Sequence, residues 1–320
     1  MRRFVAVRLL HAVVVLFLVA TAAFFLIHAA PGDPFSIESD RVPLEIRNAL
    51  RQRFGYDRPL VEQYGRYLAN VARGDFGYSH SLHVPVSTAI AERLPRTLLL
   101  MGLALALSFA VAIRLGVYEV RHLRERRARI TNGASLLMYS VPDFWMALML
   151  LLAFAYWMPM LPAGQMVDVL HDYMSPGQAA WDRVRHLLLP LAALTLQLSA
   201  MLVRYQRTAL LEVLPTDYVR TARAKGTPER AVIGRHALRN ALLPMITLAG
   251  VALPALVGGA VFVERVFSWP GMGLLAVNAI FVRDYALVIA SAVIGAAMVV
   301  LGSFLADVAY AIADPRVRVR

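Results

Sequence analysis

The chain has 320 residues, of which 59% are hydrophobic and 17% are charged, and its formal net charge is +12. Soluble domains carry about 25% charged residues, so much of this surface is expected to face lipid. The arginines cluster at the ends of apolar runs, which favours a membrane origin for the charge over nucleic-acid binding. Cysteine is absent, which excludes disulfides, thiolate metal sites and cysteine nucleophiles.

Six apolar runs predict an all-α membrane protein with six transmembrane helices. Each run is close to the ~20 residues with which a helix crosses a hydrocarbon core of ~30 Å. The second and fourth runs are short, so their helices are expected to extend past the flanking polar residues, with Arg204 reaching towards the headgroups. The runs are residues 9–30, 97–113, 144–161, 187–203, 241–263 and 286–306.

The distribution of arginine predicts the orientation of these helices. Arginines precede the first run, lie between the second and third and between the fourth and fifth, and end the chain. The positive-inside rule then places both termini in the cytoplasm. The first run follows Arg2 and Arg3 as a signal peptide would, but it exceeds the ~7–15 residues of a signal-peptide core. An uncleaved first helix is therefore expected.

Residues 31–96 form a predicted extracytoplasmic segment, which opens with the turn sequence Pro31-Gly32-Asp33-Pro34. Apolar residues at helical spacing predict two short amphipathic helices, over residues 43–54 and 59–72. Covering the segment's own apolar residues and docking at the outer mouth are alternative roles for them. The predicted organisation is thus a first transmembrane helix (1–30), this segment, and a five-helix core (97–320).

The third predicted helix is interrupted. As one helix, residues 130–161 would reach ~48 Å, more than the membrane thickness. Pro142 predicts a break, with residues 130–141 interfacial on the cytoplasmic side and residues 144–161 spanning. Asp143 then lies near the inner boundary, although intramembrane carboxylates are also candidates for a transport path. Further candidates for the path are Thr195, Gln197 and Ser199 in the fourth helix, for which helix–helix hydrogen bonding is the alternative.

Near the outer end of the fifth helix, two aromatic residues have a predicted place. Phe267 and Trp269 are expected in the outer interfacial belt, just before a turn at Pro270-Gly271. Gly258-Gly259, earlier in the same helix, is interpreted as a packing notch.

The basic stretch at residues 217–240 carries the clearest functional signal. Thr216 or Asp217 would cap a helix over residues 218–225, and Gly226 stands where a positive φ ends a helix. Pro228 suits the first turn of a second helix leading into the fifth run. The small Ala222 and Ala224 would let the first helix enter a cleft. Long basic side chains at its edges could pair with acidic groups of a partner, or merely fix topology and bind headgroups: Arg220, Arg223, Lys225, Arg235 and Arg239.

This stretch resembles the coupling (EAA) loop of permease subunits of bacterial ABC importers. Thr221-Ala222-Arg223, two residues and Gly226 follow the pattern, although only the central alanine of Glu-Ala-Ala is kept. The sequence from Arg223 to Pro244 resembles the B-type component of dipeptide, oligopeptide and nickel permeases. Further matching motifs begin at Pro31, Asp57, Gly74, Glu92, Ser140, Phe267, Arg283 and Asp314.

The resemblance implies the six-helix, MetI-like permease fold of type I ABC importers, with a cytoplasmic coupling helix, in a bacterial cytoplasmic (inner) membrane. It implies a second, similar permease as the other half of the pathway, favouring a heterodimer. It also implies two cytoplasmic ATPases carrying ATP and Mg, and an extracytoplasmic solute-binding protein. The ATPase contact would fall on Tyr218, Arg220, Thr221, Ala222, Arg223, Ala224, Lys225, Gly226, Arg235 and Arg239.

The sequence supports a separate ATPase independently of that resemblance. Lys225 is the only lysine and precedes glycine, so the chain cannot supply a G-x-x-x-x-G-K-[ST] phosphate loop. The chain is therefore expected to be non-catalytic, without a bound cofactor or metal of its own. Alternating access driven by ATP on the partner chains is the predicted mechanism.

Two other classes of membrane protein fit the sequence less well. An ion-driven transporter would need ionisable groups near the midplane, and no predicted span has one at its centre. An intramembrane enzyme would need a serine or metal constellation, and none stands out. His11 and His28 have no nearby carboxylate on the same helix, so they are not expected to act as ligands or bases. Related permeases handle di- and oligopeptides, nickel complexes and glutathione. The resemblance favours peptides and leaves the other two open.

Overall fold

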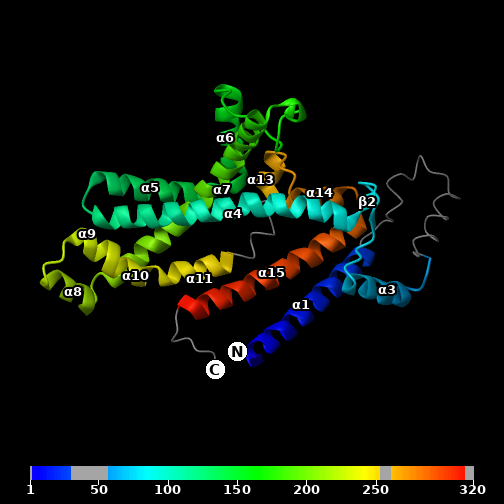
Figure 1. The fold of residues 1–320 in the computed structure, drawn as a ribbon, viewed down its shortest axis with the longest axis horizontal. Coiled ribbons are helices and arrows are strands. Elements are labelled where there is room, and N and C mark those ends of the chain that lie inside the picture. The colour runs from blue at the N-terminus through cyan, green and yellow to red at the C-terminus, as the bar shows by residue number, and fades with distance from the viewer. Residues whose placement is uncertain (1, 30–56, 253–260, 314–320) are drawn as a thin grey trace.

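The computed structural model describes residues 2–29, 57–252 and 261–313 (Figure 1). The regular secondary structure of this part is helical apart from one antiparallel pair of two-residue strands, β1 (Tyr78–Ser79) and β2 (Val84–Pro85). The motifs expected at residues 31–34, 43–54, 258–259 and 314–316 lie outside the described residues. The α-helices are α1 (Arg2–Ala29), α3 (Leu60–Ala72), α4 (Val86–Arg121), α5 (Arg126–Ser140), α6 (Asp143–Leu151), α7 (Pro176–Val213), α8 (Asp217–Ala224), α9 (Glu229–Ala231), α10 (Leu238–Ala241), α11 (Leu243–Ala252), α13 (Val261–Val266), α14 (Met272–Phe281) and α15 (Tyr285–Ala313). Short π-helical turns cover Leu152–Trp157 and Val232–Ala237, and a 3-10 turn covers His171–Tyr173.

Three helices in the described part are long and apolar enough to cross a bilayer, namely α4, α7 and α15. α4 and α7 have 36 and 38 residues, so the expected extension beyond the short second and fourth runs is confirmed. α4 also runs without interruption across residue 96, where the predicted core begins. α1 covers the first run, and α5 with α6 forms a fourth candidate span that is bent by 106°. These helices are compatible with six membrane spans, and the number six remains a prediction.

The predicted break at Pro142 is confirmed: α5 ends at Ser140 and α6 begins at Asp143. The helix after the break is shorter than predicted, because it ends in a π-helical turn at Trp157 and not at residue 161. The backbone N–H groups of Met160 and Leu161 both donate to the carbonyl of Phe154, each at 3.1 Å. These bonds fold the chain back and stop the helix.

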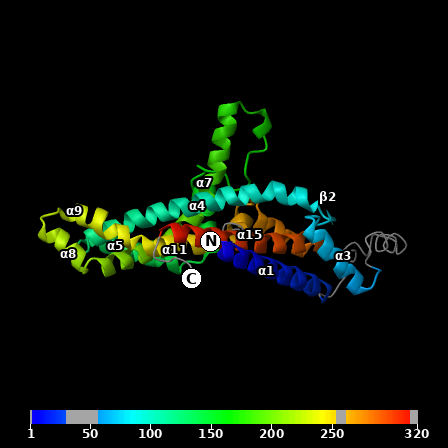
Figure 2. The same cartoon turned by 60° about the horizontal axis from the view of Figure 1, so that its bottom comes forward.

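α4 and α7 cross closely at a glycine and form the centre of the fold. A Cβ added to Gly116 of α4 would lie 2.8 Å from Cγ of Gln206 on α7, so only glycine permits this approach. α5 and α6 both pack on α7, while α1 and α11 pack along α15. Both views show the N-terminal part of α7 projecting away from α4, α15 and α1 (Figure 2).

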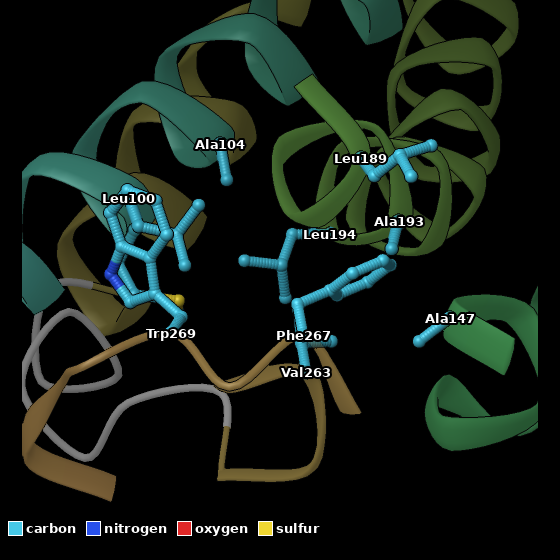
Figure 3. Close-up of a cluster of buried hydrophobic side chains, with 10 residues drawn as sticks. Leu100, Ala104, Ala147, Leu189, Ala193, Leu194, Val263, Phe267 and Trp269 are labelled. Atoms are coloured by element: carbon cyan, nitrogen blue, oxygen red, sulfur yellow. The ribbon is translucent and has the colours of Figure 1, made fainter. Parts of the chain in front are cut away.

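The main hydrophobic core encloses the two aromatic residues expected at the outer interface. Phe267 and Trp269 are each only 1% exposed, so their placement in an interfacial belt is wrong. Figure 3 shows Trp269 beside Leu100 of α4, and Phe267 beside Leu194 of α7. The indole Nε1 donates to the carbonyl of Arg96 at 3.2 Å. Because the indole N–H is hydrogen-bonded inside the protein, the ring can be buried away from the membrane interface.

A buried carboxylate fixes the short helix α14 to α4. Glu264 is 0% exposed and accepts hydrogen bonds from the Thr97 hydroxyl (2.9 Å) and the Leu274 N–H (2.8 Å). Leu274 lies in the first turn of α14, so Glu264 caps a helix that begins eight residues later in the chain, at Met272. An added Cβ on Gly271 would overlap the Glu264 carboxylate, which accounts for the glycine.

The described part of the segment predicted to be extracytoplasmic contacts α1 and the start of α15. α3 confirms the predicted helix over residues 59–72, and Tyr67 donates its hydroxyl proton to the Ala20 carbonyl of α1 at 3.2 Å. At the hairpin, the buried Asp284 accepts bonds from the hydroxyls of Ser79 (2.6 Å) and Ser81 (2.8 Å). Asp284 thereby joins the hairpin to the start of α15.

Candidate coupling surface

The helix α8 ends in a glycine corner that the sequence predicted. Gly226 has φ +78°, and its N–H donates to the Arg223 carbonyl at 2.9 Å. The N–H of Thr227 donates to the Ala222 carbonyl at 3.2 Å. These two bonds form a Schellman motif, which fixes the direction in which the chain leaves α8. At the other end Thr216 occupies the cap position, but its hydroxyl donates back to Val213 and does not cap the helix.

One face of α8 is packed against its own chain. Val219 is 0% exposed and Ala222 is 7% exposed, and both belong to a cluster with Leu210, Val232 and Ile233. Ala222 therefore packs against its own chain, and the fit of α8 into a partner's cleft remains a prediction. The Ala222 methyl group is already buried under α8, because the 3.6-residue period places it below Val219 on the inner face. α8 is thus mounted on the end of α7 and on the segment that follows the corner.

The chain after the corner is helical, as predicted, but it is not one regular α-helix. α9 passes into the π-helical turn Val232–Ala237 and then into α10. Arg121, the last residue of α4, donates to the Arg230 carbonyl at 3.1 Å. Gly234 leaves room for this arginine, since an added Cβ would lie 2.9 Å from its Nη2. The end of α4 is therefore attached to the segment that carries α8.

An ion pair closes the corner across Gly226. Arg223 donates through Nε (3.0 Å) and Nη2 (2.7 Å) to the two carboxylate oxygens of Glu229. The hydrogen bonds from Arg223 lower the pKa of the Glu229 carboxyl, so the pair persists at neutral pH and is lost only as pH falls through that lowered value. Arg223 therefore pairs within the chain while staying exposed, and its contact with a partner remains a prediction. The sequence signal for the pair was the corner itself, which brings residues six apart together.

The remaining predicted contact residues form an exposed surface. Asn240 donates to the Tyr218 hydroxyl at 2.7 Å, and Arg220 lies 3.9 Å from Asp217 of its own helix. Asn240 was missed by the sequence reasoning. Figures 1 and 2 both place α8 and α9 at one end of the molecule and α3 at the opposite end. The exposed members, called here the coupling surface, are Tyr218, Arg220, Thr221, Ala224, Lys225, Gly226, Arg235 and Arg239.

The four pathway candidates do not converge on one site. Gln197 donates through Nε2 to the Val141 carbonyl at 3.0 Å, so it links α7 to the break before α6. Ser199 donates to the Leu196 carbonyl within its own helix. Thr195 and Ser199 lie one turn apart, whereas Gln197 faces away from both. Asp143 is exposed in the first turn of α6. A pathway role for all four residues remains a prediction.

Comparisons with known proteins identify the family to which this chain belongs. Residues 97–319 match the family model described as the binding-protein-dependent transport system inner membrane component. Residues 1–101 match the N-terminal model of the same transport membrane components. The chain belongs to this family. Family membership confirms the predicted all-α, MetI-like permease fold and the role of a transport subunit.

The relatives are similar over their whole lengths. The chain is 37% identical over 319 residues to the oligopeptide transport system permease protein AppB of Bacillus subtilis, covering 99% of each chain. It is 35% identical over 321 residues to the oligopeptide transport system permease protein OppB of Haemophilus influenzae, covering 99% of this chain and 100% of the relative. It is 38% identical over 323 residues to a putative peptide permease protein of Brucella ovis, with full coverage of both. The chain is therefore an ABC importer permease of the peptide-transport type.

The described residues contain no group of three or more histidine, aspartate or glutamate side chains placed to hold a metal ion. Two buried acids, Glu264 and Asp284, accept hydrogen bonds from hydroxyl and backbone N–H groups. Their chemistry is structural, since carboxylates with two or more donors hold helix ends in place.

Proposed function

We propose that this permease imports di- and oligopeptides by alternating access, and that its coupling surface binds a separate ATPase subunit. The chain would form half of a translocation pathway, with a second permease, two ATPases that carry ATP and Mg, and an extracytoplasmic solute-binding protein. Both termini and the coupling surface would be cytoplasmic, as the arginine distribution indicates. The names of the relatives support peptide as the substrate class.

One observation carries the ATPase contact. The coupling surface is basic and exposed, and α8, which carries most of it, is held by its other face, by a Schellman corner and by the Arg223–Glu229 pair. A surface held in this way moves with α4 and α7, because Arg121 and the cluster around Leu210 join it to their ends. Force applied to α8 would therefore reach the membrane helices, which is what a lever requires.

The charge of the coupling surface gives the first test. Reversing Arg220 and Lys225 to glutamate should weaken association with the ATPase by about tenfold or more, equivalent to ~1.4 kcal/mol, because charge-assisted bonds are replaced by repulsion. Copurification of the ATPase from solubilised membranes measures this. Reversing Arg124 and Arg127, which are also exposed on this side but lie outside the coupling surface, is the matched control. Equal copurification by both double variants would contradict the assignment.

Substrate class is tested separately, in proteoliposomes that contain the whole importer and its solute-binding protein. Unlabelled tripeptide should compete with uptake of a labelled dipeptide, whereas nickel complexes or glutathione should not. Uptake that survives ATP depletion but is lost with an ionophore would support the ion-driven alternative and contradict the ATPase contact.

A further inference from the structure

Two adjoining cavities lie between α5 and α7. One has a volume of about 310 Å³ and is lined by Tyr139, Met201, Arg204, Tyr205 and Thr208. The other has a volume of about 190 Å³ and is lined by Asn132, Leu136, Arg204, Arg207 and Thr208. They share Arg204 and Thr208, so they form one cleft, called here the α5–α7 cleft.

The sequence places this cleft at the level of the cytoplasmic headgroups. Arg204 is the first charged residue after the apolar run 187–203, and Arg114 is the first after the run 97–113. The α4–α7 crossing brings these two ends together, since Gly116 lies against Gln206 and the backbone of Arg207. Two independent helices therefore leave the apolar layer at the same height, which is where arginine side chains meet lipid phosphates.

Arg204 provides an uncompensated positive charge in the cleft. Its guanidinium lies 5.5 Å from the centre of the Tyr139 ring, which orients it, and no carboxylate of the described residues pairs with it. The charge of Arg207 is different, because its Nε lies 3.5 Å from the buried carboxylate of Glu119. Glu119 thus offsets Arg207 and leaves Arg204 available. No acidic residue lines either cavity.

The rest of the lining combines polar and apolar groups, as a phospholipid requires. Asn132 and Thr208 supply uncharged hydrogen-bond donors beside Arg204. Met201, Leu136 and Tyr139 supply apolar surface at the same site. A small aqueous anion would use the donors but leave the apolar lining unused.

We propose that the α5–α7 cleft binds the phosphate of an anionic phospholipid of the cytoplasmic leaflet. Arg204 holds the phosphate by charge-assisted hydrogen bonds, Thr208 and Asn132 complete its coordination, and the apolar lining contacts the glycerol and upper acyl chains. The bound lipid joins α5 to α7 next to the break before α6. The proposal rests on the membrane placement of these helices and is independent of the substrate and of the ATPase contact.

Native mass spectrometry of the complex, purified from nanodiscs of phosphatidylglycerol and phosphatidylcholine, tests this. The wild-type complex should retain phosphatidylglycerol in preference to phosphatidylcholine. Arg204→Gln should lower that retention about tenfold, the loss expected for one charge-assisted contact. Arg127→Gln, which removes an exposed arginine of α5 outside the cleft, should leave it unchanged. Thr208→Val is a second, milder variant that should lower retention without removing charge.

Four results would overturn the proposal. Retention of phosphatidylglycerol that is unchanged in both Arg204→Gln and Thr208→Val would show that the cleft is not the site. An equal loss in Arg127→Gln would show only a general effect of charge. Displacement of the lipid by millimolar inorganic phosphate would assign the cleft to an aqueous anion. Loss of the second permease from the Arg204→Gln complex would assign it to a subunit interface.

Discussion

Gly226→Pro is expected to uncouple ATP hydrolysis from uptake. Proline fixes φ near −65° and has no N–H, whereas Gly226 has φ +78° and donates to the Arg223 carbonyl. The substitution therefore removes both the conformation and one bond of the Schellman corner. A local cost on the order of 3 kcal/mol lowers the population of the native corner roughly a hundredfold. Uptake and ATP hydrolysis, measured together in proteoliposomes, should show hydrolysis that no longer drives uptake.

Gly226→Asn is the matched control for this variant. Asparagine keeps the N–H and tolerates positive φ better than other residues with a side chain, so the corner should form. An added Cβ at Gly226 meets nothing within 4 Å, and the change therefore introduces no clash. Most of the coupled uptake should remain. Full uptake by Gly226→Pro would mean that α8 does not act as a lever.

Val219→Asp is expected to detach α8 from the rest of the protein. Val219 is 0% exposed and is the larger of the two side chains that α8 buries against Leu210, Val232 and Ile233. An unpaired carboxylate there costs several kcal/mol, which exceeds what an eight-residue helix gains from its remaining contacts. Uptake should be lost. Trypsin should cut at Arg220 and Lys225 much faster than in the wild-type complex, because a detached α8 unfolds.

A measurement of thermal stability distinguishes detachment of α8 from misfolding of the whole protein. The membrane helices do not include Val219, so the thermal stability of the solubilised bundle should change little. Val219→Ala removes two methyl groups without adding charge and should cost about 1–2 kcal/mol, giving intermediate proteolysis. Wild-type rates of cleavage and uptake in Val219→Asp would show that packing of the inner face of α8 is not needed for coupling.

Features set by local chemistry could be predicted from the sequence. The corner at Gly226 needs only a glycine, two neighbouring turns and backbone bonds within six residues. The break at Pro142 needs only a missing N–H. Both were expected and both are present. The angle of 106° at that break, and its link to Gln197, depend on where α7 lies and could not be read from residues 130–161.

Features set by distant parts of the chain were missed. An alanine on a short basic helix can pack either in a partner's cleft or in the core of its own chain. Ala222 packs in its own chain because Leu210 and Ile233 lie next to it, and their position could not be predicted from the sequence. Trp269 has the composition of an interfacial residue, and its burial follows from the Arg96 carbonyl, which is 173 residues away in sequence. Side-chain periodicity predicts which residues share a face of a helix, but it does not predict which face is covered by the rest of the protein.

The central claim is that the coupling surface is bound by an ATPase on a separate chain. Because the wild-type chain has no cysteine, Lys225→Cys introduces a unique thiol on that surface, which a maleimide-linked photo-crosslinker labels at one place. Illumination of native membranes should give a product of this chain joined to an ATPase subunit, identified by mass spectrometry, while the same label at Arg124→Cys should not. A label at Lys225→Cys that reacts only with lipid or solvent would contradict the account.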